Sequence, residues 1–229
     1  MHYLFTPPPT MTLPIQGSDT QVPVRRIYCV GQNYAEHAKE MGSSVSQDTP
    51  FFFIKHPLDM VMSGASIDYP AGTDNLHYEL ELVAVIGRPL KNTDIESARR
   101  AVCGFAVGLD LTRRDLQQVL RSRSHPWALS KSFAGAAVLS SINTNVDFDS
   151  LYQQSIVLKR NGIIRQNASL GDMARSVEEL IVYLSTLDTL HPGDLVFTGT
   201  PSGVGAVQRG DRLHGSISGI GEVHLSIVG

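Results

Sequence analysis

Two glutamates stand one residue apart in the apolar run His77-Tyr78-Glu79-Leu80-Glu81-Leu82-Val83-Ala84-Val85-Ile86-Gly87. The part from Leu80 to Ile86 has the composition of a buried strand. Because side chains alternate between the two faces of a strand, Glu79 and Glu81 point the same way. Paired carboxylates repel each other and resist burial. The pattern therefore predicts either a strand end whose acidic face meets water or a site that holds a cation between the two acids.

A third acid ends another apolar run. Asp110 closes the segment Gly104-Phe105-Ala106-Val107-Gly108-Leu109-Asp110. If it meets Glu79 and Glu81, each pair of charges at about 4 Å costs about 4 kcal/mol at an effective dielectric constant of roughly 20. Three such pairs would offset most of a domain's net stability of about 5–15 kcal/mol. Such a site needs a cation or bound protons, and its hard oxygen ligands favour Mg²⁺, Mn²⁺ or Ca²⁺ over zinc. Spacing alone does not show that the acids converge.

A histidine and a glutamate lie three residues apart in Tyr28-Cys29-Val30-Gly31-Gln32-Asn33-Tyr34-Ala35-Glu36-His37-Ala38-Lys39-Glu40-Met41-Gly42. The segment predicts a strand ending at Gly31 and a short helix with Asn33 as its N-cap and Gly42 at its end. His37 and Glu40 share a face of that helix. A carboxylate beside an imidazole orients it and keeps it basic, which equips it to activate water. The alternative is an ordinary ion pair on a solvated turn.

Six blocks of the chain together resemble the fumarylacetoacetate hydrolase family, and within it the fumarylpyruvate hydrolase and acylpyruvase branch. They follow the family's order over most of the chain after about Arg25. The last block contains the specific signature Phe197-Thr198-Gly199-Thr200-Pro201-Ser202-Gly203-Val204-Gly205. The blocks are Tyr28–Gly42, Pro50–Lys55, His77–Gly87, Gly104–Gln117, Trp127–Phe133 and Leu195–Gly215.

The resemblance implies both a fold and a metal site. The fold is α+β but mostly β, a mixed β-sandwich roll with a few short helices. Glu79, Glu81 and Asp110 match the family's metal-binding carboxylates, which usually hold Mg²⁺ or Mn²⁺, with Ca²⁺ as a substitute. Longer family members take a further acidic ligand from earlier in the chain, and no counterpart is found here.

The resemblance also assigns roles around the metal. His37 and Glu40 match a catalytic dyad on a lid helix that orders over bound ligand. Lys131 matches a lysine that supports the substrate and the charge developing on it. Gln117 and Thr200 match positions that contact the substrate.

The implied activity is metal-dependent hydrolysis of a carbon–carbon bond in an acylpyruvate, with fumarylpyruvate giving fumarate and pyruvate. His37, assisted by Glu40, takes a proton from the attacking water. The same metal site would serve an oxaloacetate decarboxylase or a dioxo-acid isomerase. Decarboxylation needs no attacking water, so the retained dyad favours hydrolysis. A third reading is an inactive protein that binds a dicarboxylate.

The chain departs from the family pattern at three places near the predicted site. Gln32 stands where relatives carry arginine in Gly-Arg-Asn-Tyr, so a cation is missing there. Ala134 replaces the aspartate of Lys-x-Phe-Asp. Lys55-His56-Pro57 replaces Lys-Pro, as though one residue were inserted. These changes leave the metal and dyad positions intact but put the identity of the acyl group in doubt.

Composition and organisation fit a small-molecule enzyme. The 229 residues carry a formal net charge of −3, and the pairs Arg25-Arg26, Arg99-Arg100 and Arg113-Arg114 are scattered, which predicts surface ion pairs and no nucleic-acid footprint. We expect residues 1–22 to form a proline-rich arm and residues 23–229 a single catalytic domain. With no targeting or membrane segment, we expect a cytoplasmic protein. The family implies a homodimer and a place in aromatic-compound catabolism.

Local patterns predict several elements and leave a few residues without a catalytic role. Helices are expected from a capping box at Thr93-Asp94-Ile95-Glu96, over Thr112–Leu120, and from a capping box at Ser176. Asn161-Gly162 indicates a hairpin turn. Cys29 and Cys103 are interpreted as core side chains, Trp127 as packing for the loop before Lys131, and His214 and His224 as isolated. His77, on the same face as Glu79, is a candidate to support the acids.

Overall fold

The run that carries the two glutamates is a central strand of the fold. The computed structural model describes residues 2–42, 44 and 49–229. In it, β8 (Leu80–Ile86) is buried at every position and lies between β14 (Asp194–Phe197) and β9 (Val102–Asp110). The sheet has the order β4-β3-β14-β8-β9-β11-β5. Its remaining strands are β4 (Phe51–Lys55), β3 (Arg26–Gly31), β11 (Ala137–Leu139) and β5 (Met60–Met62).

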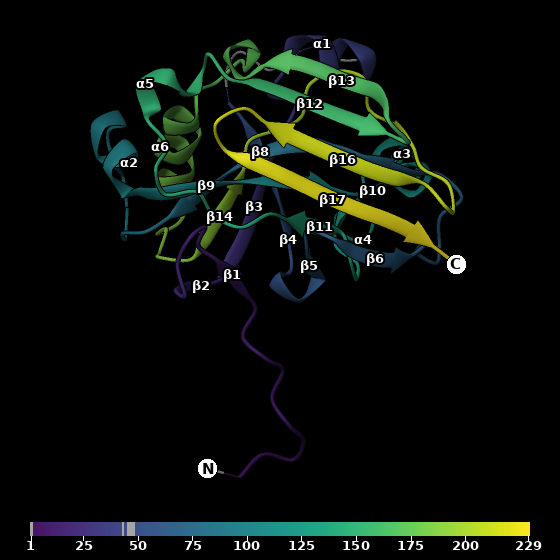
Figure 1. Ribbon diagram of the computed structural model, residues 1–229, viewed down its shortest axis with the longest axis horizontal. Helices are drawn as coiled ribbons and strands as arrows, with labels where there is room; N and C mark the ends of the chain where they lie inside the picture. Colours follow the sequence, from purple (N-terminus) through teal and green to yellow (C-terminus); the bar gives the residue numbers. More distant parts are fainter. Residues whose placement is uncertain (1, 43, 45–48) are drawn as a thin grey trace.

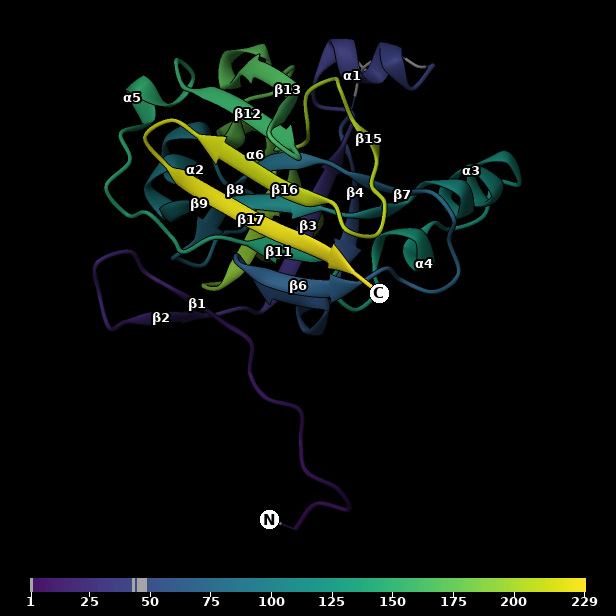
Figure 2. The same ribbon diagram turned by 45° about the vertical axis from the view of Figure 1, so that its right-hand side comes forward.

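A second, five-stranded sheet packs against one face of the first, and Figures 1 and 2 show β12, β16 and β17 in front of β8 and β9. Alternate residues of β8, such as Leu82 and Ala84, meet Leu158 and Val223 in the main apolar cluster. This arrangement is what a mixed sandwich requires, and the predicted fold class is confirmed. The sheet contains β13 (Ile163–Ser169), β12 (Ser155–Arg160), β16 (Arg212–Ile217), β17 (Gly221–Val228) and β6 (Ala65–Asp68).

The opposite face of the seven-stranded sheet holds a smaller apolar cluster, which includes Val83 and Val85. Leu13, from the hairpin of β1 (Thr12–Pro14) and β2 (Gln21–Pro23), is fully buried in it. The second half of the predicted arm therefore packs on the sheet, while the chain before it extends away from the body (Figure 1). A small sheet joins β10 (Thr112–Arg113), β7 (Leu76–Tyr78) and β15 (Gly205–Ala206).

The helices are short and lie at the edges of the sheets. Ser176 and Glu179 form the predicted capping box of α6, whereas α2 is capped by Asp94, which accepts from the N–H of Ser97, and not by Thr93. No helix in the described part of the chain has the length and apolar character to cross a bilayer. The helices are α1 (Ala35–Glu40), α2 (Ile95–Ala101), α3 (Arg114–Ser122), α4 (Ala128–Lys131), α5 (Phe148–Leu151) and α6 (Val177–Leu187), with 3₁₀ turns at Pro57–Asp59 and Leu170–Asp172.

Two predictions about single positions have opposite outcomes. Asn161 and Gly162 both have positive φ, at 54° and 80°, between β12 and β13, as a two-residue hairpin turn requires, so that prediction is confirmed. Cys103 is exposed, so its placement in the core is wrong, while Cys29 is buried as expected. The cause is a bulge: Val85 pairs with Gly104 and Ile86 with Val102, which leaves Cys103 as the extra residue.

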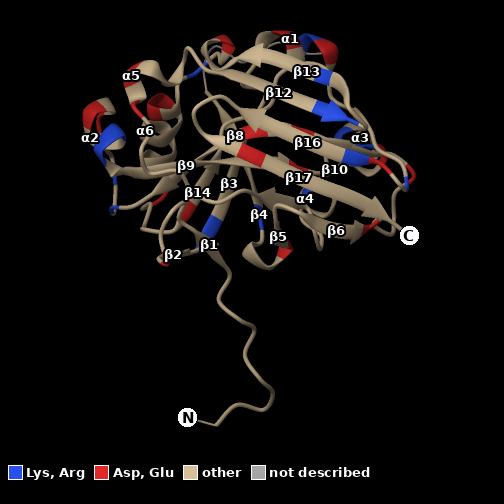
Figure 3. Ribbon diagram, in the orientation of Figure 1, with Lys and Arg blue, Asp and Glu red and all other residues tan. Residues whose placement is uncertain are grey.

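Charged side chains are spread over several helices and strands (Figure 3). Most of the arginine pairs make the predicted local ion pairs, such as Arg26 with Asp194 at 2.9 Å and Arg100 with Glu96 at 2.8 Å. Arg114 also forms an ion pair, with Glu79, but that pair is buried and Arg114 is only 3% exposed. Its surroundings belong to the site described next.

Candidate active site

The register between β8 and β9 brings the three predicted acids together. Leu80 pairs with Leu109, so Glu79 lies opposite Asp110, whose N–H donates to the Glu79 carbonyl at 2.8 Å. Because Glu81 lies two residues after Glu79, all three side chains leave the same face of the sheet. Their carboxylates offer oxygens within 4.8 Å of one another, and all three residues are buried.

Two cations compensate Glu79. Lys131 Nζ donates to Glu79 Oε2 and Asp110 Oδ2, both at 2.8 Å, and Arg114 forms an ion pair with Glu79 Oε1. Burial by itself raises the pKa of Glu79, but Lys131 and Arg114 outweigh it and hold that pKa well below its usual range. Burial lowers the pKa of Lys131, and the carboxylates of Asp110 and Glu79 more than restore it. Lys131, which was predicted to support the substrate, therefore contacts two of the three acids directly.

Lys55 is a residue that the sequence did not assign to the site. It is fully buried, and its Nζ lies 2.8 Å from Asp110 Oδ1 and donates to the Leu111 carbonyl at 3.1 Å. Arg114 was predicted to lie at the surface or in a local ion pair; it forms an ion pair, with Glu79, but is buried and not at the surface. Helix α3 starts directly after β10, and its first residue, Arg114, places its guanidinium beside Glu79. The sequence did offer one signal for Lys55, since it ends an apolar, aromatic strand and a lysine buried there needs a charged partner.

Glu81 differs from the other two acids. It accepts a hydrogen bond from the Gly199 N–H at 2.7 Å, and the described residues place no side-chain cation within ion-pair distance of it. Burial raises the pKa of Glu81, and the carboxylates of Asp110 and Glu79 raise it further, well above its usual value. A divalent cation would remove this penalty, and three carboxylate ligands suit a hard ion. The residues present therefore fit a Mg²⁺ or Mn²⁺ site.

The charge count around the acids also bears on the ligand. The carboxylates of Glu79, Glu81 and Asp110 face the cations of Lys55, Lys131 and Arg114, so the formal charges already cancel. A bound divalent metal would leave the site with a formal excess of two positive charges. Such a site attracts an anionic molecule rather than a neutral one.

His37 and Glu40 form the predicted pair. His37, with its side chain 8% exposed, places Nδ1 3.3 Å from Glu40 Oε2. Both Glu40 oxygens also lie 3.2 Å from the Gly203 nitrogen, whose N–H donates to them. Glu40 therefore orients the imidazole and ties α1 to the loop from Thr198 to Gly205.

The prediction of Asn33 as the N-cap of this helix is wrong. Tyr34 occupies that position and makes no side-chain capping bond. The Asn33 amide instead donates to the carbonyls of Thr198 and Arg175, each at 2.9 Å. Asn33 thus fixes the end of β3 to two loops that border the site.

Backbone approach explains two glycines of the signature loop. Gly199 has φ of +92°, and a Cβ there would meet the Asn33 Cβ at 2.8 Å. Gly203 has φ of +93°, and a Cβ there would lie 2.1 Å from the Arg165 carbonyl oxygen. Glycine is needed at both, and each directs its N–H at a glutamate, Glu81 or Glu40.

Thr200 is held by a buried glutamine that sequence reasoning missed. The Thr200 Oγ1 donates to the Leu80 carbonyl and accepts from Gln166 Nε2, both at 2.8 Å. Gln166 also accepts from the Leu80 N–H at 3.1 Å. Gln166 lies in the five-stranded sheet, far from any motif, so nothing in the sequence pointed to it.

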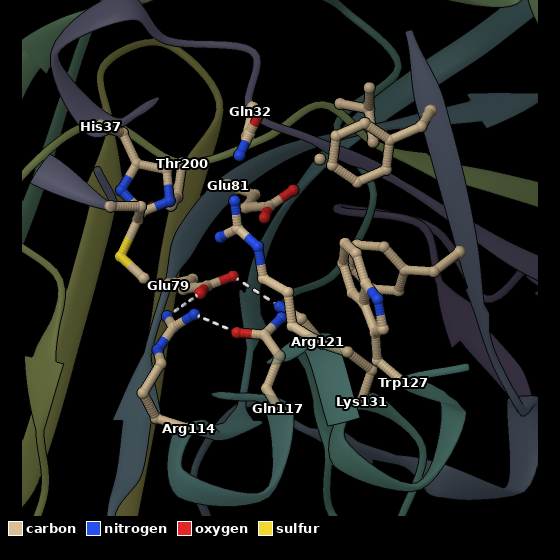
Figure 4. Close-up of a pocket in the computed structure, with 15 residues that line it drawn as sticks. Gln32, His37, Glu79, Glu81, Arg114, Gln117, Arg121, Trp127, Lys131 and Thr200 are labelled. Carbon is tan, nitrogen blue, oxygen red and sulfur yellow. Dashed lines mark hydrogen bonds and ion pairs between the residues drawn. The ribbon is translucent and has the colours of Figure 1, made fainter. Parts of the chain in front are cut away.

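One cavity joins these groups (Figure 4). Its polar wall is made by side chains predicted for the site, and Gln117 Oε1 accepts from Arg114 at 2.5 Å within it. Asp110 and Glu40 contact residues of this wall but do not line the cavity themselves. Trp127 packs edge-on to Phe51, at 5.5 Å between ring centroids, and also lines the cavity. The predicted residues that line the cavity are His37, Glu79, Glu81, Gln117, Lys131 and Thr200.

Three other histidines can now be placed. His77 Nε2 lies 3.0 Å from Asn75 Oδ1, and burial together with Arg114 lowers the pKa of His77 to about 4. His214 and His224, predicted to be isolated, stack at 4.4 Å with Glu222 beside them. Their rings are parallel to within 7°, and both Nε2 atoms face Glu222 Oε2, at 3.2 and 3.5 Å, so these three residues form a second cluster whose polar atoms lie within 4.8 Å of one another.

Comparison with known proteins identifies the family of this site. The family model described as Fumarylacetoacetate (FAA) hydrolase C-terminal matches residues 26–228. The chain belongs to this family. It is 41% identical to a fumarylpyruvate hydrolase from Ralstonia sp. over 80% of this chain and 94% of that protein. It is 38% identical to the oxaloacetate tautomerase YcgM of Escherichia coli strain K12, over 86% of this chain and 90% of the relative.

A solved fumarylacetoacetate hydrolase family structure has the same fold. The fumarylpyruvate hydrolase of Pseudomonas aeruginosa, in complex with Mn²⁺ and pyruvate, superposes with a TM-score of 0.94 at 44% identity, covering 99% of each chain. The predicted family is confirmed. With it, the expectation of an enzyme of the class that hydrolyses carbon–carbon bonds is confirmed.

Proposed function

We propose that the protein hydrolyses a carbon–carbon bond in an acylpyruvate, with fumarylpyruvate as the substrate and fumarate and pyruvate as products. One observation supports this most strongly: a buried carboxylate cluster with one uncompensated acid, Glu81, lines the same cavity as the paired His37. The fumarylpyruvate hydrolases of Ralstonia sp. and Pseudomonas aeruginosa are similar over 80% and 99% of this chain, respectively.

Glu79, Glu81 and Asp110 would hold the metal, Mg²⁺ or Mn²⁺. A metal bound there would chelate the carboxylate and adjacent keto oxygen of the substrate and stabilise the negative charge of the departing pyruvate. Lys131, whose ammonium already lies between Glu79 and Asp110, would offset negative charge at the same end. Gln117 and Thr200, which both line the cavity, would position the substrate.

His37 would take a proton from the water that attacks the distal carbonyl. Its Nδ1 faces Glu40, so Nε2 is left to act as the base, and Glu40 stabilises the imidazolium that forms. The bond between Glu40 and the Gly203 N–H keeps this pair fixed over the cavity. The hydroxide would add to the distal carbonyl carbon, and the bond between that carbon and the pyruvoyl methylene would then break, which leaves fumarate and the enolate of pyruvate. The enolate would take up the proton that His37 removed from the water, which completes the hydrolysis.

Enolisation of oxaloacetate is the second candidate, because the similar Escherichia coli protein is an oxaloacetate tautomerase. Tautomerisation or decarboxylation of an oxo acid would use the same carboxylates but would need no attacking water. The buried, carboxylate-paired His37 favours hydrolysis.

The experiment compares fumarylpyruvate, acetylpyruvate and oxaloacetate at saturating Mg²⁺ or Mn²⁺, with products identified by NMR. We expect fumarate and pyruvate from fumarylpyruvate as the fastest reaction. Rapid loss or tautomerisation of oxaloacetate without hydrolysis of either acylpyruvate would replace the proposed reaction. We also propose a cytoplasmic homodimer, which light scattering tests as a mass of twice 24.9 kDa.

A further inference from the structure

Helix α3 presents three polar side chains to the cavity, at spacings of three and four residues that share one helix face. Arg114, in the first turn, is held by Glu79 and Gln117. Gln117, in the next turn, binds Arg114. Arg121 is the third. The rise of a helix places it about 10 Å along the axis from Arg114.

Arg121 brings to the cavity a positive charge that no described carboxylate neutralises. The residue is exposed and lines the cavity, and its side chain forms no ion pair or hydrogen bond with any other described residue. Figure 4 shows its guanidinium reaching into the cavity on the side of Gln32 and Glu81. Its neighbour Arg113 instead lies over the Phe133 ring, 4.4 Å from the centroid, and donates to the Leu129 carbonyl at 3.0 Å.

Among the described residues, no lysine or arginine lines the cavity wall opposite α3. Gln32, with φ of 60°, lines the cavity where the family pattern predicted an arginine. Arg121 approaches that wall from the other side of the cavity (Figure 4). Phe51 and Trp127 line the apolar part of the same cavity and suit a flat, unsaturated chain.

We propose that Arg121 binds the distal carboxylate of the substrate and makes the enzyme selective for acylpyruvates that carry a second carboxylate. This inference rests on the proposed function: the pyruvoyl group of the substrate must lie at the carboxylates of Glu79, Glu81 and Asp110 for its distal carboxylate to reach Arg121. A guanidinium offers two parallel N–H donors to a carboxylate.

The test compares kcat/KM for fumarylpyruvate and for acetylpyruvate, which has a methyl group in place of the distal carboxylate-bearing chain. In Arg121→Ala we expect kcat/KM for fumarylpyruvate to fall about 10- to 100-fold, mostly through KM, because a hydrogen-bonded charge is lost. The value for acetylpyruvate should stay within about twofold. Arg121→Lys should recover part of the loss, since a single ammonium cannot form the paired bonds.

Arg123→Ala is the matched control, since Arg123 is exposed at the end of the same helix and does not line the cavity. It should leave both substrates unchanged. An equal loss for both substrates in Arg121→Ala, or no loss for either, would overturn the proposal.

Binding measurements separate this inference from the proposed function. If the wild-type protein hydrolyses neither compound, the proposed function fails, and calorimetric titration of the Mn²⁺-loaded protein with the same two compounds still tests Arg121. Tighter binding of fumarylpyruvate that disappears in Arg121→Ala would support its role. Equal affinities of the variant and the wild type for fumarylpyruvate would refute it.

Discussion

At the scale of single residues, Glu81 separates a metal site from a cluster of internal ion pairs. Glu79 and Asp110 have their own ammonium and guanidinium partners, whereas Glu81 has the Gly199 N–H. Burial and the two neighbouring carboxylates raise the pKa of Glu81 well above its usual value. The protein therefore retains an acid that gains most from a bound cation.

Glu81→Ala should weaken Mn²⁺ binding more than about 100-fold and abolish hydrolysis with it, since a ligand contributes more than the surrounding groups that orient it. Calorimetric titration with Mn²⁺ measures the first effect and steady-state assays the second. The exposed Glu96→Ala serves as the control. If Glu81→Ala binds Mn²⁺ with wild-type affinity, Glu81 is not a metal ligand.

His37→Ala should keep Mn²⁺ affinity but lower kcat for fumarylpyruvate by about 10²- to 10⁴-fold, the usual contribution of a general base. Glu36→Ala, one position earlier on the exposed face of α1, should have normal activity. Hydrolysis at the wild-type rate in His37→Ala would show that another group activates the water.

Sequence predicted the acids and the dyad but not their partners. Lys55 comes from the end of β4, Arg114 from the first turn of α3, and Gln166 from the five-stranded sheet. None of these contacts follows from local spacing. They depend on how distant segments are juxtaposed, and only the three-dimensional structure supplies that.

At the scale of secondary structure, strand register decides whether the site exists. Shifting β8 against β9 by one residue would turn Glu79 and Glu81 to the other face and separate them from Asp110. Alternation within each strand was readable from the sequence. The pairing of Leu80 with Leu109 was not, and neither was the bulge that exposes Cys103.

Helix α6 provides a separate test of element-level electrostatics. Glu178, in its first turn, is 5% exposed, accepts from the Tyr152 hydroxyl and pairs with Arg99 Nε at 2.9 Å. Burial raises the pKa of Glu178, but the bonds from Tyr152, its own backbone N–H and Arg99 outweigh this and lower it.

Because the pKa of Glu178 is lower in the folded state, its stabilisation is present above the unfolded value of 4.5 and is lost as pH falls through the folded value. Glu178→Gln should reduce the free energy of unfolding by about 1–3 kcal/mol at pH 7. Denaturant unfolding should show this difference shrinking below about pH 4.5. Glu96→Gln, at an exposed site, should show little change, and a deficit for Glu178→Gln that is the same at low pH would contradict the assignment.

At the scale of the whole molecule, the seven-stranded sheet buries both faces and carries the site at one end, where β8, β9 and the 198–205 loop meet. The fold class was predictable because blocks that resemble the fumarylacetoacetate hydrolase family occur in that family's order. The packing of the β1–β2 hairpin was not, since Leu13 stands in a proline-rich stretch that reads as an extended arm.

Metal binding should stabilise the entire fold, because the ligands come from two adjacent central strands. At Mn²⁺ about 100 times its dissociation constant, linkage adds about 2.7 kcal/mol. For a chain of this size, that raises Tm by roughly 5–10 °C. Scanning calorimetry should show the rise in the wild type and not in Glu81→Ala. An identical rise in both would place the bound metal elsewhere.

The most direct test of the central claim is hydrolysis of fumarylpyruvate by protein stripped of metal with a chelator and then titrated with Mn²⁺. The account predicts that the stripped protein is inactive and that fumarate and pyruvate form in proportion to occupancy of one ion per chain. Full hydrolysis by the stripped protein, or none after one ion per chain is bound, would contradict it.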